Sequence, residues 1–177
     1  MADPARLPES TLVGLETGER ELSAAWGRRV VLAAMSALVL AGALGLLGVR
    51  TETSTATDGT WHLSVEHASV ARAGLDVPWQ ATVVHPGGFG KTLTLAVTGD
   101  YFDIYETQGF HPEPSATTRD AHTLYLTFDT PPSGDVFTVA YDAYIQPASQ
   151  QGRDATVAVL DHGATVASVH IDTHLLP

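Results

Sequence analysis

The sequence FTVAYDAYI, residues 137–145, decides the fold class of this chain. Apolar side chains occupy every second position of this stretch. Successive side chains of a β-strand point to opposite faces, so a period of two predicts a strand with one buried face. The predicted buried set is Phe137, Val139, Tyr141, Ala143 and Ile145.

The same alternation recurs through residues 61–177. Shorter alternating stretches occupy 61–65, 79–83, 93–97 and 124–128, and residues 154–160 and 164–174 predict a hairpin around Asp161-His162-Gly163. Turn-forming sequences separate the strands: PGGFG at 86–90, PPSGD at 131–135 and QPASQQG at 146–152. Seven short strands with no helix between them predict an all-β fold, a seven-stranded immunoglobulin-like β-sandwich. Pro78 lacks an amide hydrogen, so its strand is expected to begin there or to lie at an edge.

A long apolar run precedes these strands, in GRRVVLAAMSALVLAGALGLLGVR at 27–50. Its 20 uncharged residues, 30–49, are expected to form a helix long enough to cross a bilayer core of about 30 Å. Arg28 and Arg29 stand directly before the run, and Trp26 precedes them as a further membrane-interface residue. The positive-inside rule then predicts a single-pass protein of the cell membrane with a cytoplasmic N-terminus.

A cleaved signal peptide is the alternative interpretation of this run. Ser54-Thr55-Ala56 places small residues at the −3 and −1 positions of a cleavage site. The apolar region of a signal peptide usually has about 7–15 residues, and this run is longer, which favours a permanent anchor.

One face of the predicted helix carries a ladder of small residues at successive i+4 positions. Such ladders let two helix backbones approach closely, so the predicted partner is an integral membrane protein or a second copy of the chain. The general abundance of alanine and glycine in the chain is the competing explanation. The ladder consists of Ala33, Ala37, Ala41 and Gly45.

Charge and composition complete the predicted organisation. The predicted order is a cytoplasmic segment at 1–29, a transmembrane span at 30–49, a threonine-rich linker at 50–60 and an extracytoplasmic domain at 61–177. The cytoplasmic segment has helix formers in GERELSAAWGRR, which are expected to extend the transmembrane helix inward. Residues 51–177 hold 4 basic against 15 acidic side chains. This charge repels nucleic acid and argues against flat docking on anionic lipid, so contact with the bilayer is assigned to the helix. The chain has no cysteine, so the hydrophobic core must hold the domain together.

Three segments carry a resemblance to known proteins: PGGFGKTLTLAVTGDYFDIY at 86–105, LYLTFDTPPSGDVFTVAYDAYIQP at 124–147 and ATVAVLDHGATVASVHIDT at 155–173. Their order resembles a group of uncharacterised actinobacterial single-pass membrane proteins with an exported immunoglobulin-like domain. More loosely, it is similar to repeat domains of bacterial surface proteins. The resemblance spans about residues 61–177. It implies that the gene often lies beside a gene for a YetF-like membrane protein, and it implies no activity.

The sequence contains no established catalytic motif, neither a nucleophile elbow, a P-loop, a dinucleotide fingerprint nor HExxH. We therefore predict a protein without enzymatic activity and without a cofactor. All eight histidines lie beyond residue 60, and His170, Asp172 and His174 alternate on the last predicted strand. These side chains suit zinc or copper, but strand positions i and i+4 are about 14 Å apart, which disfavours one shared ion. Solvated histidines or a pH-responsive contact surface are the remaining interpretations.

The interval after the third strand is unusually long, aromatic and acidic. In YFDIY, residues 101–105, we expect a short strand with Phe102 and Ile104 buried and the tyrosines exposed. The spacing of its carboxylates does not match a calcium loop of the EF-hand type. Aromatic side chains dominate many interfaces, so residues 100–114 are the predicted partner-contact segment. The contact candidates are Tyr101, Tyr105, Phe110 and His111.

These observations predict a non-enzymatic, membrane-anchored interaction module or accessory subunit of a bacterial membrane complex. The alternatives are an exported domain that processes a metal or a substrate, and a purely structural cell-surface module.

Overall fold

The computed structural model of the chain describes residues 19–46, 48–106, 109–129 and 134–176. The stretch before Glu19, which is most of the predicted cytoplasmic segment, and most of the predicted turn at 131–135 lie outside these residues. The chain divides between Leu47 and Gly48 into two units, a helical one and a β domain.

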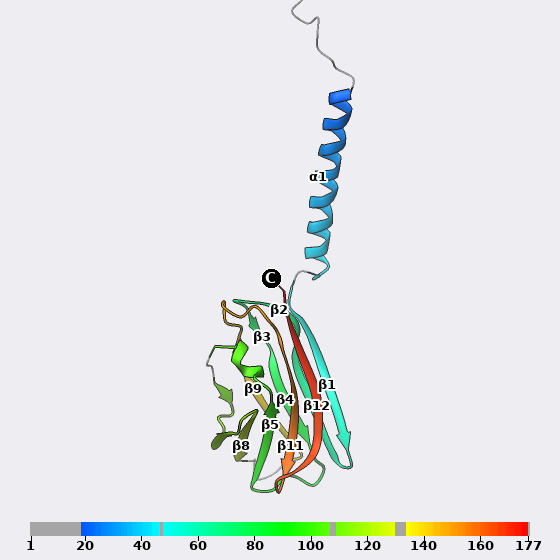
Figure 1. Cartoon of the computed structure of the whole chain (residues 1–177). Helices are drawn as coiled ribbons and strands as arrows, with labels where there is room; N and C mark the ends of the chain where they lie inside the picture. The colour runs from blue at the N-terminus through cyan, green and yellow to red at the C-terminus, as the bar shows by residue number, and fades with distance from the viewer. Residues whose placement is uncertain (1–18, 47, 107–108, 130–133, 177) are drawn as a thin grey trace, which may run out of the picture. The chain divides into compact units, whose positions relative to one another are not determined.

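Helix α1, Glu19–Ala43, forms the helical unit (Figure 1). Its window Ala24–Ala43 is long and apolar enough to cross a membrane, by length and composition. The helix begins before the predicted span, as the helix formers of GERELSAAWGRR indicate, and Trp26, Arg28 and Arg29 lie within it.

The helix ends earlier than the apolar run does. Gly45 has a φ of 71°, and the amide of Leu46 donates to the carbonyl of Ala41 at 2.9 Å. A glycine in this left-handed conformation closes a helix because it has no Cβ to clash. The prediction that Gly45 continues the helical ladder is therefore wrong, whereas Ala33, Ala37 and Ala41 lie within α1.

The β domain consists of strands and one short 3₁₀ helix, η1, Tyr101–Ile104. The strands within the described residues are β1 Arg50–Asp58, β2 Trp61–Arg72, β3 Asp76–Val77, β4 Trp79–Val84, β5 Thr92–Thr98, β6 Phe110–His111, β7 Ala116–Arg119, β8 Thr123–Asp129, β9 Val136–Tyr141, β10 Ala143–Tyr144, β11 Arg153–Asp161 and β12 Ala164–Leu176.

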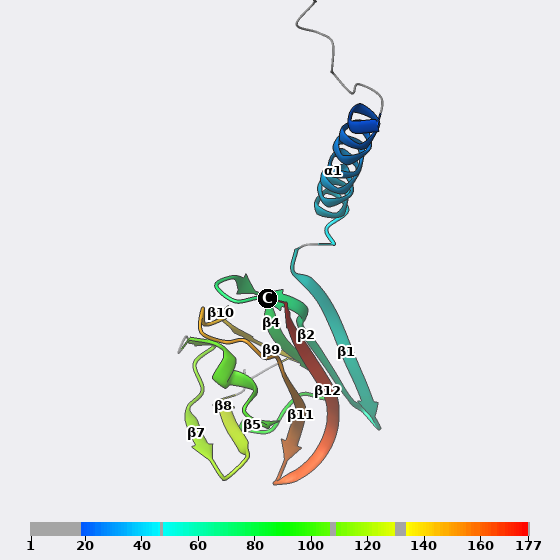
Figure 2. The same ribbon diagram turned by 45° about the horizontal axis from the view of Figure 1, so that its top comes forward.

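Nine of the strands form one continuous path in the order β6-β9-β4-β2-β12-β11-β5-β8-β7, which curls into a half-barrel (Figures 1 and 2). Strand β12 joins the two halves, because it pairs with β11 along most of its length and with β2 at its end. The β2–β12 pairing is parallel and covers His174–Leu176 against Val70–Arg72. Strand β1 pairs with β2 outside this path, and β10 pairs with β3.

All seven predicted strands are present, but the number seven is too low for the described domain. The longest predicted alternation is interrupted at Asp142, and its two parts pair with different strands, β9 with β4 and β10 with β3. Its predicted buried face is confirmed, because all five of its apolar side chains are buried. Strand β4 begins directly after Pro78, as expected from the missing amide hydrogen.

The threonine-rich segment differs from the predicted linker. Arg50–Asp58 forms β1 and pairs with β2 over its whole length. Threonine is β-branched and favours strands, and Ser54 and Ala56 turn inward as half-buried side chains. Period-two burial is weak in a strand at the edge of a sheet, which is why apolar patterning alone did not find it.

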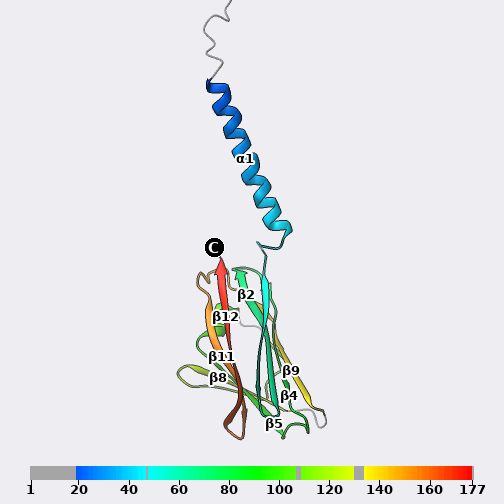
Figure 3. The same ribbon diagram turned by 90° about the vertical axis from the view of Figure 1, so that its right-hand side faces the viewer.

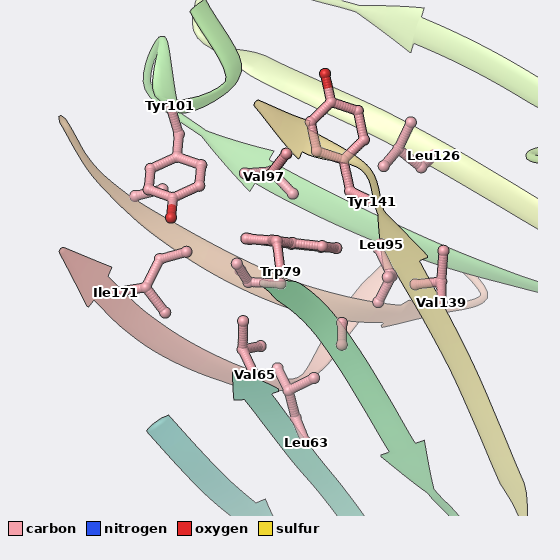
Figure 4. Close-up of a cluster of buried hydrophobic side chains, with 14 of the residues drawn as sticks. Leu63, Val65, Trp79, Leu95, Val97, Tyr101, Leu126, Val139, Tyr141 and Ile171 are labelled. Atoms are coloured by element: carbon pink, nitrogen blue, oxygen red, sulfur yellow. The ribbon is translucent and has the colours of Figure 1, made fainter. Parts of the chain in front are cut away.

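Apolar side chains from both halves of the sheet meet in one core (Figure 4). Trp79 of β4 lies at its centre, 1 % exposed, among Val65 of β2, Val97 of β5 and Ile171 of β12. Because each strand contributes every second residue, burial of these side chains fixes the register of the strands that bear them.

Candidate functional site

A polar groove with a volume of about 380 Å³ lies where β1, β2 and β12 come together. Strand β1 accompanies β2 along its length, whereas β12 meets β2 only at the end of both strands. The groove is lined by Glu52 and Ser54 of β1, His67, Ser69 and Val70 of β2, and His170, Asp172 and His174 of β12.

A β-bulge shapes one wall of the groove. Arg50 pairs with Val70 and Thr51 with Ala68, so Ser69 is an extra residue in β2. A bulge disturbs the alternation of side chains. As a consequence, the adjacent residues His67 and Ala68 are both buried.

His67 lies at the buried end of the groove with 2 % of its surface exposed. Its Nδ1 is 3.3 Å from the carbonyl oxygen of Ala68, and its Nε2 is 3.3 Å from the Ser54 hydroxyl. A carbonyl oxygen can only accept a hydrogen bond, so Nδ1 carries the proton in the neutral ring. Nε2 then accepts from Ser54, which connects β2 to β1 by side chains as well as by the backbone ladder.

Behind the groove, three hydroxyl groups continue the polar contacts into the core. Thr173 donates to the carbonyl oxygen of Ala68 at 2.6 Å, Tyr101 lies 2.9 Å from Thr173, and Tyr105 donates to Tyr101 at 3.1 Å. Each hydroxyl has one hydrogen, and that of Thr173 is used on a carbonyl. The donor order is therefore fixed from Tyr105 to Tyr101 to Thr173 to Ala68.

Burial governs the ionisation of these phenols. Burial raises the pKa of Tyr101 above its usual value, and the neighbouring Asp172 carboxylate acts in the same direction. Burial also raises the pKa of Tyr105, which is further raised by its interaction with Tyr101. Both side chains remain neutral hydrogen-bonding groups at physiological pH.

The structure overturns the expected exposure of Tyr101 and Tyr105, which are 0 % and 2 % exposed. Residues 101–104 form the 3₁₀ helix η1 instead of a strand, so Tyr101 and Ile104, three positions apart, share a face. Alternation does not apply to a helix, and Tyr105 turns inward after it. The burial of Ile104 is confirmed, and Phe102 packs partly buried against Trp79 with ring centroids 5.3 Å apart.

The other predicted contact residues differ from one another. Phe110 is partly buried and packs on Tyr141 with ring centroids 4.6 Å apart. His111 is exposed, and its Nε2 lies 3.0 Å from the Asp142 carboxylate. Asp142 also lines a second, acidic hollow of about 500 Å³ together with Glu66 and Asp76. Residues 107–108 of the predicted contact segment lie outside the described residues.

The three alternating polar residues of β12 do share the groove. His174 Nε2 lies 2.9 Å from Asp172 Oδ2, and His170 lines the same wall. Within the described ranges, no three histidine or carboxylate side chains lie in positions that could hold one metal ion.

Sequence reasoning named His170, Asp172 and His174 but missed His67, Glu52 and Ser54. His67 continues the alternation of Trp61, Leu63 and Val65, which marks it as an inward-facing polar residue. Glu52 and Ser54 had no such indication, because only the pairing of β1 with β2 brings them beside His67.

Comparison with known proteins gives no family for the chain: no family model matches it, and no curated protein matches it.

Proposed function

We propose that this chain is a non-enzymatic, membrane-anchored accessory subunit of a membrane complex. In this proposal α1 spans the cell membrane with the N-terminus in the cytoplasm, and the β domain lies on the extracytoplasmic side. Helix α1 contacts a helix of an integral membrane protein, and the β domain carries the second contact surface, at the polar groove.

The observation that carries the proposal is the surface of α1. None of the residues of its apolar window, Ala24–Ala43, is buried within the structure. An apolar helix surface of this length requires lipid or another helix around it. Ala33, Ala37 and Ala41 give one side of this surface the small side chains that allow close backbone approach.

The β domain supports a binding role through its architecture. Its long strands are β1, β2, β4, β5, β8, β9, β11 and β12, and they fall into two groups on either side of the β2–β12 pairing, with β1 beside β2. We assign this arrangement to the immunoglobulin-like folds, a group in which many members bind through edges and loops. The assignment follows the strand order and is part of the proposal.

The test is purification of the tagged full-length chain from native membranes in mild detergent, with identification of the proteins that accompany it. The expected result is a stoichiometric integral membrane protein. Replacing Ala37 with Leu should reduce its recovery several-fold, because the larger side chain separates the two helix backbones.

Ala43→Leu is the matched control, since Ala43 lies about 120° around α1 from Ala37, off the alanine face, and receives the same added volume. Equal recovery with Ala37→Leu, Ala43→Leu and the unchanged chain would contradict docking through the alanine face. Recovery of the chain alone from native membranes would contradict the accessory role itself.

One observation favours an exported processing domain as a second candidate. The Ser54 hydroxyl and His67 Nε2, 3.3 Å apart, have the arrangement of a nucleophile and its base, with Nδ1 oriented by a carbonyl oxygen. A neutral carbonyl stabilises an imidazolium less than the carboxylate of a catalytic triad does. Labelling of the chain by a fluorophosphonate, lost in Ser54→Ala and retained in Ser64→Ala, would favour this candidate.

A further inference from the structure

Strand β1 lies at an edge of the sheet. Within the described residues it pairs only with β2, and its other edge carries no ladder. Figures 1 and 2 show β1 at the margin of the domain, and Figure 3 turns that margin toward the viewer. An open edge presents unpaired backbone N–H and C=O groups, which are a template for another strand.

The usual protections of an edge are absent from the middle of β1. Residues 53–57, TSTAT, contain no charge, no proline and no glycine. The bulge near Arg50 inserts its extra residue into β2, so β1 itself is continuous. Thr51, Thr53, Thr55 and Thr57 form one exposed row of β-branched side chains, a composition that favours strand pairing.

The charges at the ends of β1 indicate which strand fits this edge. Arg50 begins the strand and Asp58 ends it, and Ser54 lies at its centre. If a second β1 runs antiparallel with Ser54 opposite Ser54, Arg50 of each copy faces Asp58 of the other. All nine residues then overlap, with Thr51 opposite Thr57 and Thr53 opposite Thr55.

Backbone geometry permits the register centred on Ser54, and side-chain charges disfavour the permitted register next to it toward the C-terminus. The backbone N–H and C=O groups of successive residues point to opposite edges of a strand. When two copies of β1 pair through the same free edge, each even-numbered residue therefore faces an even-numbered residue of the other copy, and each odd-numbered residue faces an odd-numbered one. The register centred on Ser54 obeys this condition. The next permitted register toward the C-terminus, centred on Thr55, places Glu52 opposite Asp58, and facing like charges destabilise a strand pair.

We propose that β1 is a homotypic docking edge: two copies of the chain join by antiparallel β1–β1 pairing centred on Ser54. The pairing generates a two-fold axis, extends the sheet of each copy into that of the other, and closes with two Arg50–Asp58 ion pairs. It is independent of whichever helix α1 contacts.

Disulfide trapping tests the register directly, because the chain has no cysteine of its own. In the full-length chain in native membranes, Ser54→Cys should form a disulfide-linked dimer on mild oxidation with diamide, since facing Cα atoms lie about 5 Å apart. Thr57→Cys is the control: its two copies would be separated by about 20 Å along the pair and should not cross-link. We expect at least about a tenfold difference in dimer yield. Equal yields for the two variants, or no dimer with Ser54→Cys, would overturn the proposal.

A charge exchange tests the predicted Arg50–Asp58 ion pairs, with the Ser54→Cys cross-link as the readout. Asp58→Arg in the Ser54→Cys background should lower the dimer yield several-fold, and adding Arg50→Asp should restore it, because the exchanged charges again oppose each other. If the variant with both exchanges is folded and its dimer yield is not restored, the proposal is also overturned. Ala37→Leu should leave the Ser54 cross-link unchanged, so loss of a helix partner and loss of strand pairing are separate results.

Discussion

At the scale of single residues, the hydroxyl of Thr173 connects the two halves of the sheet. It is fully buried on β12, donates to the Ala68 carbonyl of β2, and is the acceptor for Tyr101 of η1. Three elements that are distant in sequence therefore share one hydrogen-bonding centre. A buried donor or acceptor left without its partner loses water as well as the hydrogen bond.

Thr173→Val removes that hydroxyl while keeping the size and branching of the side chain. The Ala68 carbonyl loses a donor and the Tyr101 hydroxyl loses its acceptor, so the free energy of unfolding should fall by about 1–3 kcal/mol. Chemical denaturation of the β domain, followed by tryptophan fluorescence in detergent, measures the change. Thr118→Val on the exposed strand β7 is the control and should change stability little; an equal effect of both would show that the network contributes nothing.

The buried phenols predict how stability depends on pH. An unfolded tyrosine ionises near pH 10, and burial raises the folded pKa of Tyr101 and Tyr105 above that value. The unfolded chain therefore loses its protons first, so the stabilisation is complete below about pH 10 and declines as the pH rises above it. The melting temperature should fall between pH 9 and 11, and Tyr105→Phe should make this fall less steep. An unchanged slope in Tyr105→Phe would contradict the assignment.

At the scale of elements, the β11–β12 hairpin shows a turn that its sequence specifies. His162 and Gly163 have φ angles of 49° and 81°, the two positive values that a two-residue hairpin turn of type I′ requires. The predicted hairpin around Asp161-His162-Gly163 is thus confirmed. The neighbouring element η1 shows the opposite case, since YFDIY alternates like a strand and folds as a 3₁₀ helix.

The turn predicts that two substitutions change the free energy of unfolding in opposite directions. Gly163→Ala places a Cβ in a left-handed conformation and should lower the free energy of unfolding by about 1 kcal/mol. His162→Asn should raise the free energy of unfolding by roughly a few tenths of a kcal/mol, because asparagine adopts a positive φ more readily than histidine does. Thermal melting of both variants measures the difference; a stabilised Gly163→Ala would show that the turn has another conformation.

At the scale of the whole molecule, the position of β1 bears on the alternative of a cleaved signal. The possible cleavage site after Ala56 lies inside β1, and cutting there would remove most of the strand and uncover the edge of β2. The half-buried side chains of Ser54 and Ala56 would be lost with it. The fold of the β domain therefore favours a chain that keeps its N-terminal helix.

The proposed topology predicts which side of the membrane each unit faces. In the cysteine-free chain, a membrane-impermeant thiol reagent added to intact cells should label Thr118→Cys and leave Ser10→Cys unlabelled until the cells are opened. The intact mass should show that residues 1–56 remain attached. Labelling of Ser10→Cys in intact cells would reverse the topology, and a soluble chain beginning near Thr57 would replace the anchor with a signal peptide.

The sequence by itself determined the features that depend on local periodicity. The apolar run before Arg50 predicts the helix, and strict alternation, as in Phe137–Ile145, predicts the strands and their buried faces, because both patterns follow from the geometry of one segment. Tertiary structure alone decided the rest. The pairing of β1 with β2, the burial of Tyr101 and Tyr105, and the meeting of His67 with His170 and Asp172 depend on which segments become neighbours. Packing across the whole domain decides which segments become neighbours, and the sequence of one segment does not contain that information.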